Sequence, residues 1–139
     1  MKPYEFLPHT ADVKFLAYGE SLEEAFGNAA LATFATMTDI KKVKAKSKKT
    51  VSVQAHDYSC LLYSFLEDLL FLLDTEDFCL SKITVSLSQK DDSLFLEAES
   101  YGDNVKNYET HTLVKAVTYH EMTIQKLKKL WVIQVILDV

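Results

Sequence analysis

The last nine residues, 131–139, read WVIQVILDV and decide the fold class. Because apolar residues occupy both faces of this alternating segment, it predicts a central β-strand that is covered on both sides. A buried strand that runs to the last residue would hold in place a chain end that usually frays. Asp138 and the carboxylate of Val139 would then lie together, and two such anionic groups repel each other unless a positive charge compensates them.

Asp12 is a candidate companion for this acidic end, because it opens a segment over 13–18 that also looks extended. If the two strand ends meet, Asp12, Asp138 and the carboxylate of Val139 form a cluster of oxygen ligands only. Such a cluster suits Ca²⁺ or Mg²⁺ better than zinc. The sequence spacing leaves open whether they meet; in the alternative, Asp12 caps a turn and Asp138 is merely solvated.

Two helices are predicted among several strands. Ser21 is the expected N-cap of the first helix, with Glu24 completing a capping box and the end near 38–39. Asp57 is the expected cap of the second helix, whose wide leucine stripe predicts that it is the more deeply buried of the two. The remaining predictions are strands at 4–7, 50–55, 83–87 and 94–98, with the last two forming a hairpin, and a connection at 126–130.

The fold class that follows is α+β, with two main helices packed on a mixed, mostly antiparallel β-sheet. A chain of 139 residues is long enough for one domain, over 1–139, and too short for two. Residues 1–5 lack the apolar run of a signal peptide, and the longest apolar stretches are too short to span a membrane. The two cysteines, Cys60 and Cys79, fit buried thiols in a reducing compartment, so a soluble cytoplasmic protein is expected.

The net charge of −5 argues against a general nucleic-acid binder. The segment 41–49 nevertheless contains six lysines. It could contact RNA phosphates or an acidic partner, but a solvated loop or a lysine-protected edge strand is an equally physical interpretation.

Motifs of independent catalysis are missing from the sequence. The four histidines lack the spacing of a zinc motif, and the three glycines are too far apart for a phosphate loop. Residues 118–121 (TYHE) could supply a general acid or base, although surface histidines are the simpler interpretation. The sequence therefore predicts a protein that is not an enzyme; a metal-dependent hydrolase using Asp12 and Asp138 is a remote alternative.

Several segments, taken in order, resemble the archease family. The N-terminal signature is carried by 9–13 (HTADV), 18–19 (YG), 21–26 (SLEEAF) and 37–39 (MTD). The resemblance continues in the leucine-rich segment 61–74, in 114–120 (VKAVTYH) and in the final Asp138 and Val139. It covers nearly the whole chain and is weakest in the lysine-rich segment and in 102–111.

The resemblance implies a single archease domain without catalytic chemistry of its own. It implies an activator of an RtcB-type RNA ligase in tRNA splicing, which promotes guanylylation of the ligase and its multiple turnover and broadens its use of nucleotide triphosphates. GTP and manganese would belong to the partner ligase, and tRNA would be contacted at most indirectly. The competing interpretation is a chaperone or RNA-presenting module for tRNA-modifying enzymes.

The resemblance also maps a metal site onto Asp12, Asp138 and Val139, with calcium or another divalent cation as the ligand. A secondary site or partner contact is expected from four further residues: His9, Asp39, Lys115 and His120.

Overall fold

The computed structural model describes residues 2–9 and 11–139. Thr10, which belongs to the N-terminal signature, lies outside the described residues. The elements follow in the order β1 (Tyr4–Leu7), β2 (Val13–Gly19), α1 (Leu22–Ala35), η1 (Ile40–Lys42), β3 (Ser47–Ala55), α2 (Tyr58–Glu76), β4 (Phe78–Lys90), β5 (Ser93–Asn104), η2 (Val105–Asn107), β6 (Ala116–Val117), β7 (Thr123–Leu127) and β8 (Leu130–Asp138). None of the helices in the described part of the chain is long and apolar enough to cross a membrane.

The C-terminal strand β8 is central, as its sequence predicts. It pairs with β2 along one edge and with β7 and then β6 along the other. With β1 on the far side of β2, these strands make a five-stranded sheet. Four of the nine residues of β8 are buried, at 133 and at 135–137, which fixes this strand firmly in the core.

The remaining strands form a second, three-stranded sheet in the order β3-β5-β4. The β4–β5 hairpin is confirmed, and it is longer than the sequence predicts: polar residues extend it toward the turn, and buried residues at 78–80 extend it at the other end. All strand pairs among the described residues are antiparallel, so the predicted fold class of two helices on a mostly antiparallel sheet is confirmed, with the strands divided between two sheets.

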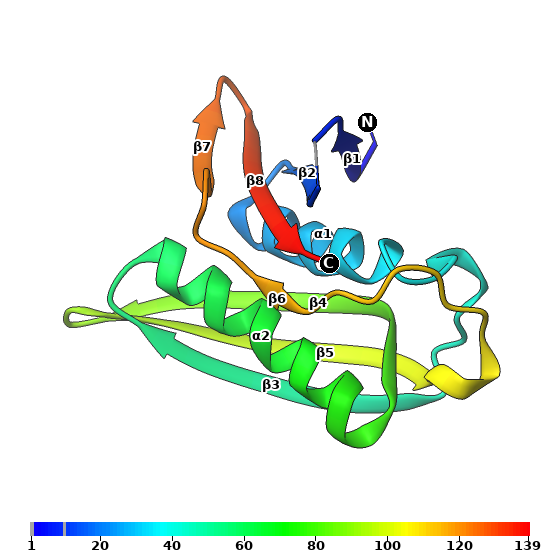
Figure 1. Cartoon of the computed structure of the whole chain (residues 1–139). Coiled ribbons are helices and arrows are strands. Elements are labelled where there is room, and N and C mark those ends of the chain that lie inside the picture. Colours follow the sequence, from blue (N-terminus) through cyan, green and yellow to red (C-terminus); the bar gives the residue numbers. More distant parts are fainter. Residues whose placement is uncertain (1, 10) are drawn as a thin grey trace.

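Figure 1 shows α1 between the two sheets and α2 lying along the three-stranded sheet. Helix α1 contacts β2 and β8 on one side and β4 on the other, and nine of its 14 residues are buried. Only six of the 19 residues of α2 are buried. The prediction that the second helix is the more deeply buried is therefore wrong, because α1 packs closely against both sheets, whereas α2 packs on the three-stranded sheet and meets the other sheet mainly at the short strands β6 and β7.

Both predicted N-caps are confirmed. The Ser21 hydroxyl accepts a hydrogen bond from the Glu24 N–H at 3.0 Å, and the Asp57 carboxylate accepts one from the Cys60 N–H at 2.8 Å. The Glu24 side chain reaches back to the N–H of Glu20 instead of the cap residue itself. Each cap satisfies a main-chain donor that the first turn of a helix leaves free.

Three local predictions need correction. The first helix ends at Ala35, before the predicted 38–39, because the N–H of Met37 bonds to the carbonyl of Phe34 and tightens the last turn. The predicted connection at 126–130 is mostly strand, since β7 continues to Leu127 and only 128–129 form the turn. Cys79 is buried as expected, whereas Cys60 is only half-buried.

The lysine-rich segment divides into η1, a short connection and the start of β3. Strand β3 lies at one edge of its sheet, so the edge-strand interpretation fits the second half of the segment. Lys48 and Lys49 form ion pairs with Glu99 and Glu76 at 3.1 and 2.6 Å.

Candidate functional site

The structure brings together the strand ends that carry Asp12 and Asp138. Strands β2 and β8 are antiparallel, with Val13 opposite Leu137. Asp12 immediately precedes Val13 and Asp138 immediately follows Leu137, so both lie at the same end of neighbouring strands. Opposite residues in an antiparallel pair have Cα atoms about 5 Å apart. The question that the sequence left open, whether these strand ends meet, is thus answered, while their role as metal ligands stays a prediction.

The main chain of Asp138 is held on its other side by β6. Ala116 lies opposite Asp138, and the N–H of Lys115 donates to the carbonyl oxygen of Asp138 at 2.7 Å. The Asp138 side chain is exposed, and Asp12 is half-buried. Because successive side chains of a strand alternate between its faces, Asp138 lies on the face opposite to the buried Leu137. We call Asp12, Asp138 and Val139 the acidic end; the main chain of Asp138 is held by Lys115, and its side chain is exposed at the end of the strand.

A second group of predicted residues gathers around Glu121. The carboxylate of Glu121 lies 4.0 Å from Nε2 of His9 and 3.4 Å from Nε2 of His120. It also accepts a hydrogen bond from the Lys14 ammonium at 3.1 Å. Two of the four candidates for a secondary site therefore share one carboxylate, which lies in the turn between β6 and β7 and is bound by Lys14 of β2.

Lys14 is a member of this group that the sequence does not single out. It is 107 residues from Glu121, and the pairing of both β2 and β7 with β8 brings the two together. Gln134 of β8 donates to the carbonyl oxygen of Glu121 at 2.8 Å and so fixes the turn that carries it. The run of titratable residues at 119–121 is too common a pattern to indicate this arrangement.

We expect Lys14→Met to raise the pKa of Glu121 toward that of an ordinary glutamate. The hydrogen bond from Lys14 is the largest cause that holds this pKa below its usual range. Because the folded pKa is lowered, the stability that the pair contributes is present above the ordinary glutamate pKa and is lost as the pH falls through the lowered value. An NMR titration of the side-chain carboxyl carbons measures the shift.

The matched control is Lys82→Met, which removes a lysine from the other sheet, where Lys82 lies over the ring of Tyr101. It should leave the pKa of Glu121 unchanged. An unchanged pKa of Glu121 in Lys14→Met as well would mean that Lys14 does not cause the shift.

Asp39 does not join either group. It is the N-cap residue of η1 and lines a separate hollow of about 180 Å³ with Lys42, Tyr108, Glu109 and His111. The structure thus brings His9, His120 and Lys115 to the strands of the acidic end and places Asp39 on another surface.

The donor chemistry of the acidic end fits a hard cation. It offers carboxylate oxygens and no nitrogen or sulfur, as Ca²⁺ and Mg²⁺ require. No group of three or more His, Cys, Asp or Glu side chains in residues 2–9 and 11–139 is arranged so that it could hold a metal ion. The acidic end contains two such side chains and a main-chain carboxylate, so water or carbonyl oxygens would have to complete the six to eight ligands that calcium prefers.

Comparison with known proteins identifies the family. The model of the archease protein family matches residues 4–139. The chain belongs to this family. An archease of Methanothermobacter thermautotrophicus is 45% identical over 139 residues, and one of Sulfurisphaera tokodaii is 39% identical over 141 residues. The alignments cover 99% of both chains in the first case and 100% in the second, and the resemblance read from the sequence is confirmed.

Solved structures agree with the archease fold. The solution structure of Methanobacterium thermoautotrophicum protein 1598 superposes with a TM-score of 0.88 at 42% identity and covers 100% of both chains. The crystal structure of a Thermotoga maritima archease, described as a possible chaperone, gives a TM-score of 0.60 at 15% identity, covering 96% of this chain and 94% of that one. This second likeness concerns the fold alone.

Proposed function

We propose that this archease is a non-catalytic activator of an RtcB-type RNA ligase in tRNA splicing, acting in the cytoplasm. It would promote guanylylation of the ligase, support multiple turnover and broaden the range of nucleotide triphosphates that the ligase accepts. Membership of the archease family supports the proposal. The single structural observation that carries it is the acidic end: Asp12 and Asp138 lie at the same end of the paired strands β2 and β8, and β8 is hydrogen-bonded on both sides.

In this proposal Asp12, Asp138 and the carboxylate of Val139 hold a divalent cation, calcium by preference. The bound cation would supply positive charge and free coordination positions for oxygen atoms of the ligase or its nucleotide. The protein's own contribution is placement, because the main-chain bonds from Lys115 to Asp138 and from β2 to β8 keep the carboxylates from moving apart. Binding of this end to one conformation of the ligase would shift the ligase toward the state that accepts GMP.

A guanylylation assay tests the proposal directly. RtcB-type ligase, GTP and manganese are incubated with and without this protein, and the covalent ligase–GMP adduct and the number of ligated RNA ends per ligase are measured. We expect a faster formation of the adduct and more than one ligation per ligase only when the protein is present. Equal rates and equal turnover in the two reactions would refute the proposal.

The second candidate is a chaperone or RNA-presenting module for tRNA-modifying enzymes. The lysine-rich segment favours it, because Lys41, Lys42, Lys44 and Lys46 are exposed. The words "possible chaperone" are also attached to the Thermotoga maritima relative. Tight, salt-sensitive binding of this chain to free tRNA would support this candidate. Turnover of a phosphoester by the isolated chain would instead indicate a hydrolase.

A further inference from the structure

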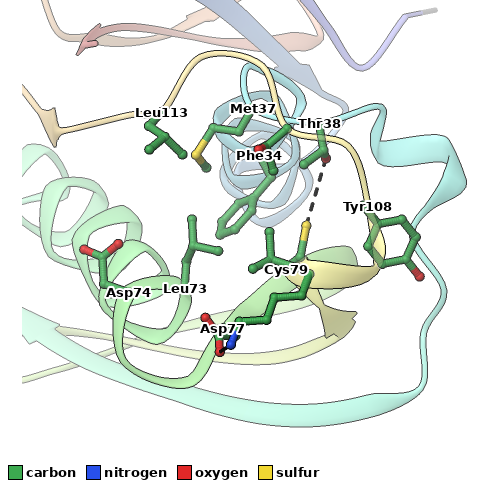
Figure 2. A pocket seen from close by; sticks show the side chains of 12 residues that line it. Phe34, Met37, Thr38, Leu73, Asp74, Asp77, Cys79, Tyr108 and Leu113 are labelled. Carbon is green, nitrogen blue, oxygen red and sulfur yellow. Dashed lines mark hydrogen bonds and ion pairs between the residues drawn. The ribbon is translucent and has the colours of Figure 1, made fainter.

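A cavity of about 360 Å³ lies at the C-terminal ends of the two helices, and it shares no residue with the acidic end. Apolar side chains form much of its wall. Phe34 and Met37, from the last turn of α1 and just beyond it, are fully buried, and Figure 2 shows them with Leu73 around the centre of the cavity. Leu113 stands at the mouth with 65% of its surface exposed. An apolar group bound here would be surrounded by side chains on several sides.

The edge of this cavity is negatively charged. Asp74 and Asp77 lie at the C-terminal end of α2, where the helix dipole is already negative. The last turn of α2 contains no basic residue. Lys106 lies 3.4 Å from Asp77 and compensates that carboxylate, whereas Asp74 forms no ion pair within the described part of the chain. Carboxylates at the C-terminal end of a helix reduce its stability. Residues that are unfavourable for the local structure are expected at functional sites.

The deep end of the cavity contains a hydroxyl group with a weak partner. Thr38 is only 3% exposed, and its hydroxyl lies 4.0 Å from the thiol of Cys79, as the dashed line in Figure 2 marks. A thiol is a weak hydrogen-bonding group, so the hydroxyl keeps most of its capacity to bind another polar atom. Burial raises the pKa of the Cys79 thiol, which stays neutral and adds no charge here.

We propose that this cavity binds a small amphipathic amine, with its apolar body against Leu73 and Leu113 and its ammonium group beside Asp74. The volume lies at the small end of the range of ligand cavities, which suits a compact ligand. A cation gains from both the carboxylate and the helix end, whereas an anion is repelled by both. The site is independent of the ligase-activating function proposed above.

The probes are three ligands with one body and different charges: 4-phenylbutylamine, 4-phenylbutan-1-ol and 4-phenylbutanoate. Each is titrated into ¹⁵N-labelled protein and followed by amide chemical shifts. We expect the shifts to be largest around the cavity, with the amine bound most tightly and the carboxylate least. Equal affinity for all three ligands, or shifts elsewhere only, would overturn the proposal.

Asp74→Asn should weaken binding of the amine about threefold, as expected for a partly solvated ion pair, and leave the alcohol unaffected. Glu67→Gln is the matched control, because it removes one negative charge from the same helix two turns earlier and outside the cavity. Its affinity for the amine should equal that of the unchanged protein. Equal weakening in both variants would mean that net charge, and not Asp74, attracts the amine, and would refute the assignment.

A second variant and a second ligand source complete the test. Leu73→Trp fills the cavity and should abolish binding of the amine and the alcohol while the remaining amide spectrum stays folded. The dipeptide acetyl-Phe-Lys-amide is compared with its Nε-acetylated form, to ask whether the ammonium can come from a protein side chain. Binding of the dipeptide only in its charged form would support ammonium recognition with a protein as the source; no binding of either ammonium ligand would overturn it.

Discussion

Asp12→Ala and Asp138→Ala are each expected to abolish stimulation of the ligase while the fold stays intact. Removing one of three carboxylates should weaken binding of a divalent cation at least about tenfold, because affinity at oxygen-ligand sites depends on the number of charged ligands. Both side chains lie at the surface end of their strands, so the free energy of unfolding should change by no more than about 0.5 kcal/mol. Guanylylation of the ligase and luminescence of bound Tb³⁺, a calcium substitute, provide two independent measurements.

Asp92→Ala is the control for these variants. It removes the same charge at the turn of the β4–β5 hairpin, far along the chain from the acidic end, and should keep full stimulation and full Tb³⁺ binding. A glycine added after Val139 moves the main-chain carboxylate and should therefore also weaken binding of the cation. Full stimulation by folded Asp12→Ala or Asp138→Ala would show that the acidic end does not carry the activity. If stimulation is lost while Tb³⁺ binding is unchanged, the substituted residue contacts the ligase and does not bind the metal.

The central position of β8 could be predicted because an apolar pattern on both faces has one structural meaning for a short segment. The relative burial of the two helices could not be predicted from the sequence. A helical stripe shows that one face is covered, and it does not show that α1 has a sheet on each side. Leu61 and its neighbours form the more conspicuous stripe, whereas α1 is buried largely through small residues such as Ala29 and Ala30, which allow both sheets to approach.

The sequence identifies the residues of the acidic end, but it does not show how they lie relative to one another. The pattern marked Asp12 and Asp138 as strand ends, and only the register of β2 against β8 brings them side by side. The pair formed by Lys14 and Glu121 could not be predicted, because in the sequence both are ordinary charged residues and only a contact over 107 residues joins them. The cavity has the same origin: its walls come from both helices, from the start of β4 and from the loop after β5.

Gly102→Ala is expected to destabilise the fold by about 3 kcal/mol or more, because the new methyl group has no space. A Cβ atom at this position would overlap the carbonyl oxygen of Cys79 and lie 2.9 Å from its carbonyl carbon. Both belong to the main chain of β4, so no side-chain rotation can relieve the clash. The register of β4 against β5 shifts between Leu80 and Lys82, immediately beside this contact. Gly102 therefore allows the close approach of the two strands at an irregularity within their pairing, which continues to Phe78 and Asn104.

Gly27→Ala is the matched control, and the opposite sign is expected. Gly27 lies within α1, and a Cβ atom there would meet Cγ2 of Ile83 at 3.5 Å and Cγ2 of Val85 at 3.7 Å, which are ordinary contacts. Alanine is favoured over glycine within a helix by about 1 kcal/mol, so this variant should be more stable than the unchanged protein. Urea unfolding followed by circular dichroism measures both variants. If Gly102→Ala unfolds at the same urea concentration as the unchanged protein, strand β4 can move away and does not need glycine beside it. If Gly27→Ala is instead destabilised, α1 and β4 are packed too tightly for one methyl group, and the space between the helix and the three-stranded sheet is smaller than the contacts of Ile83 and Val85 indicate.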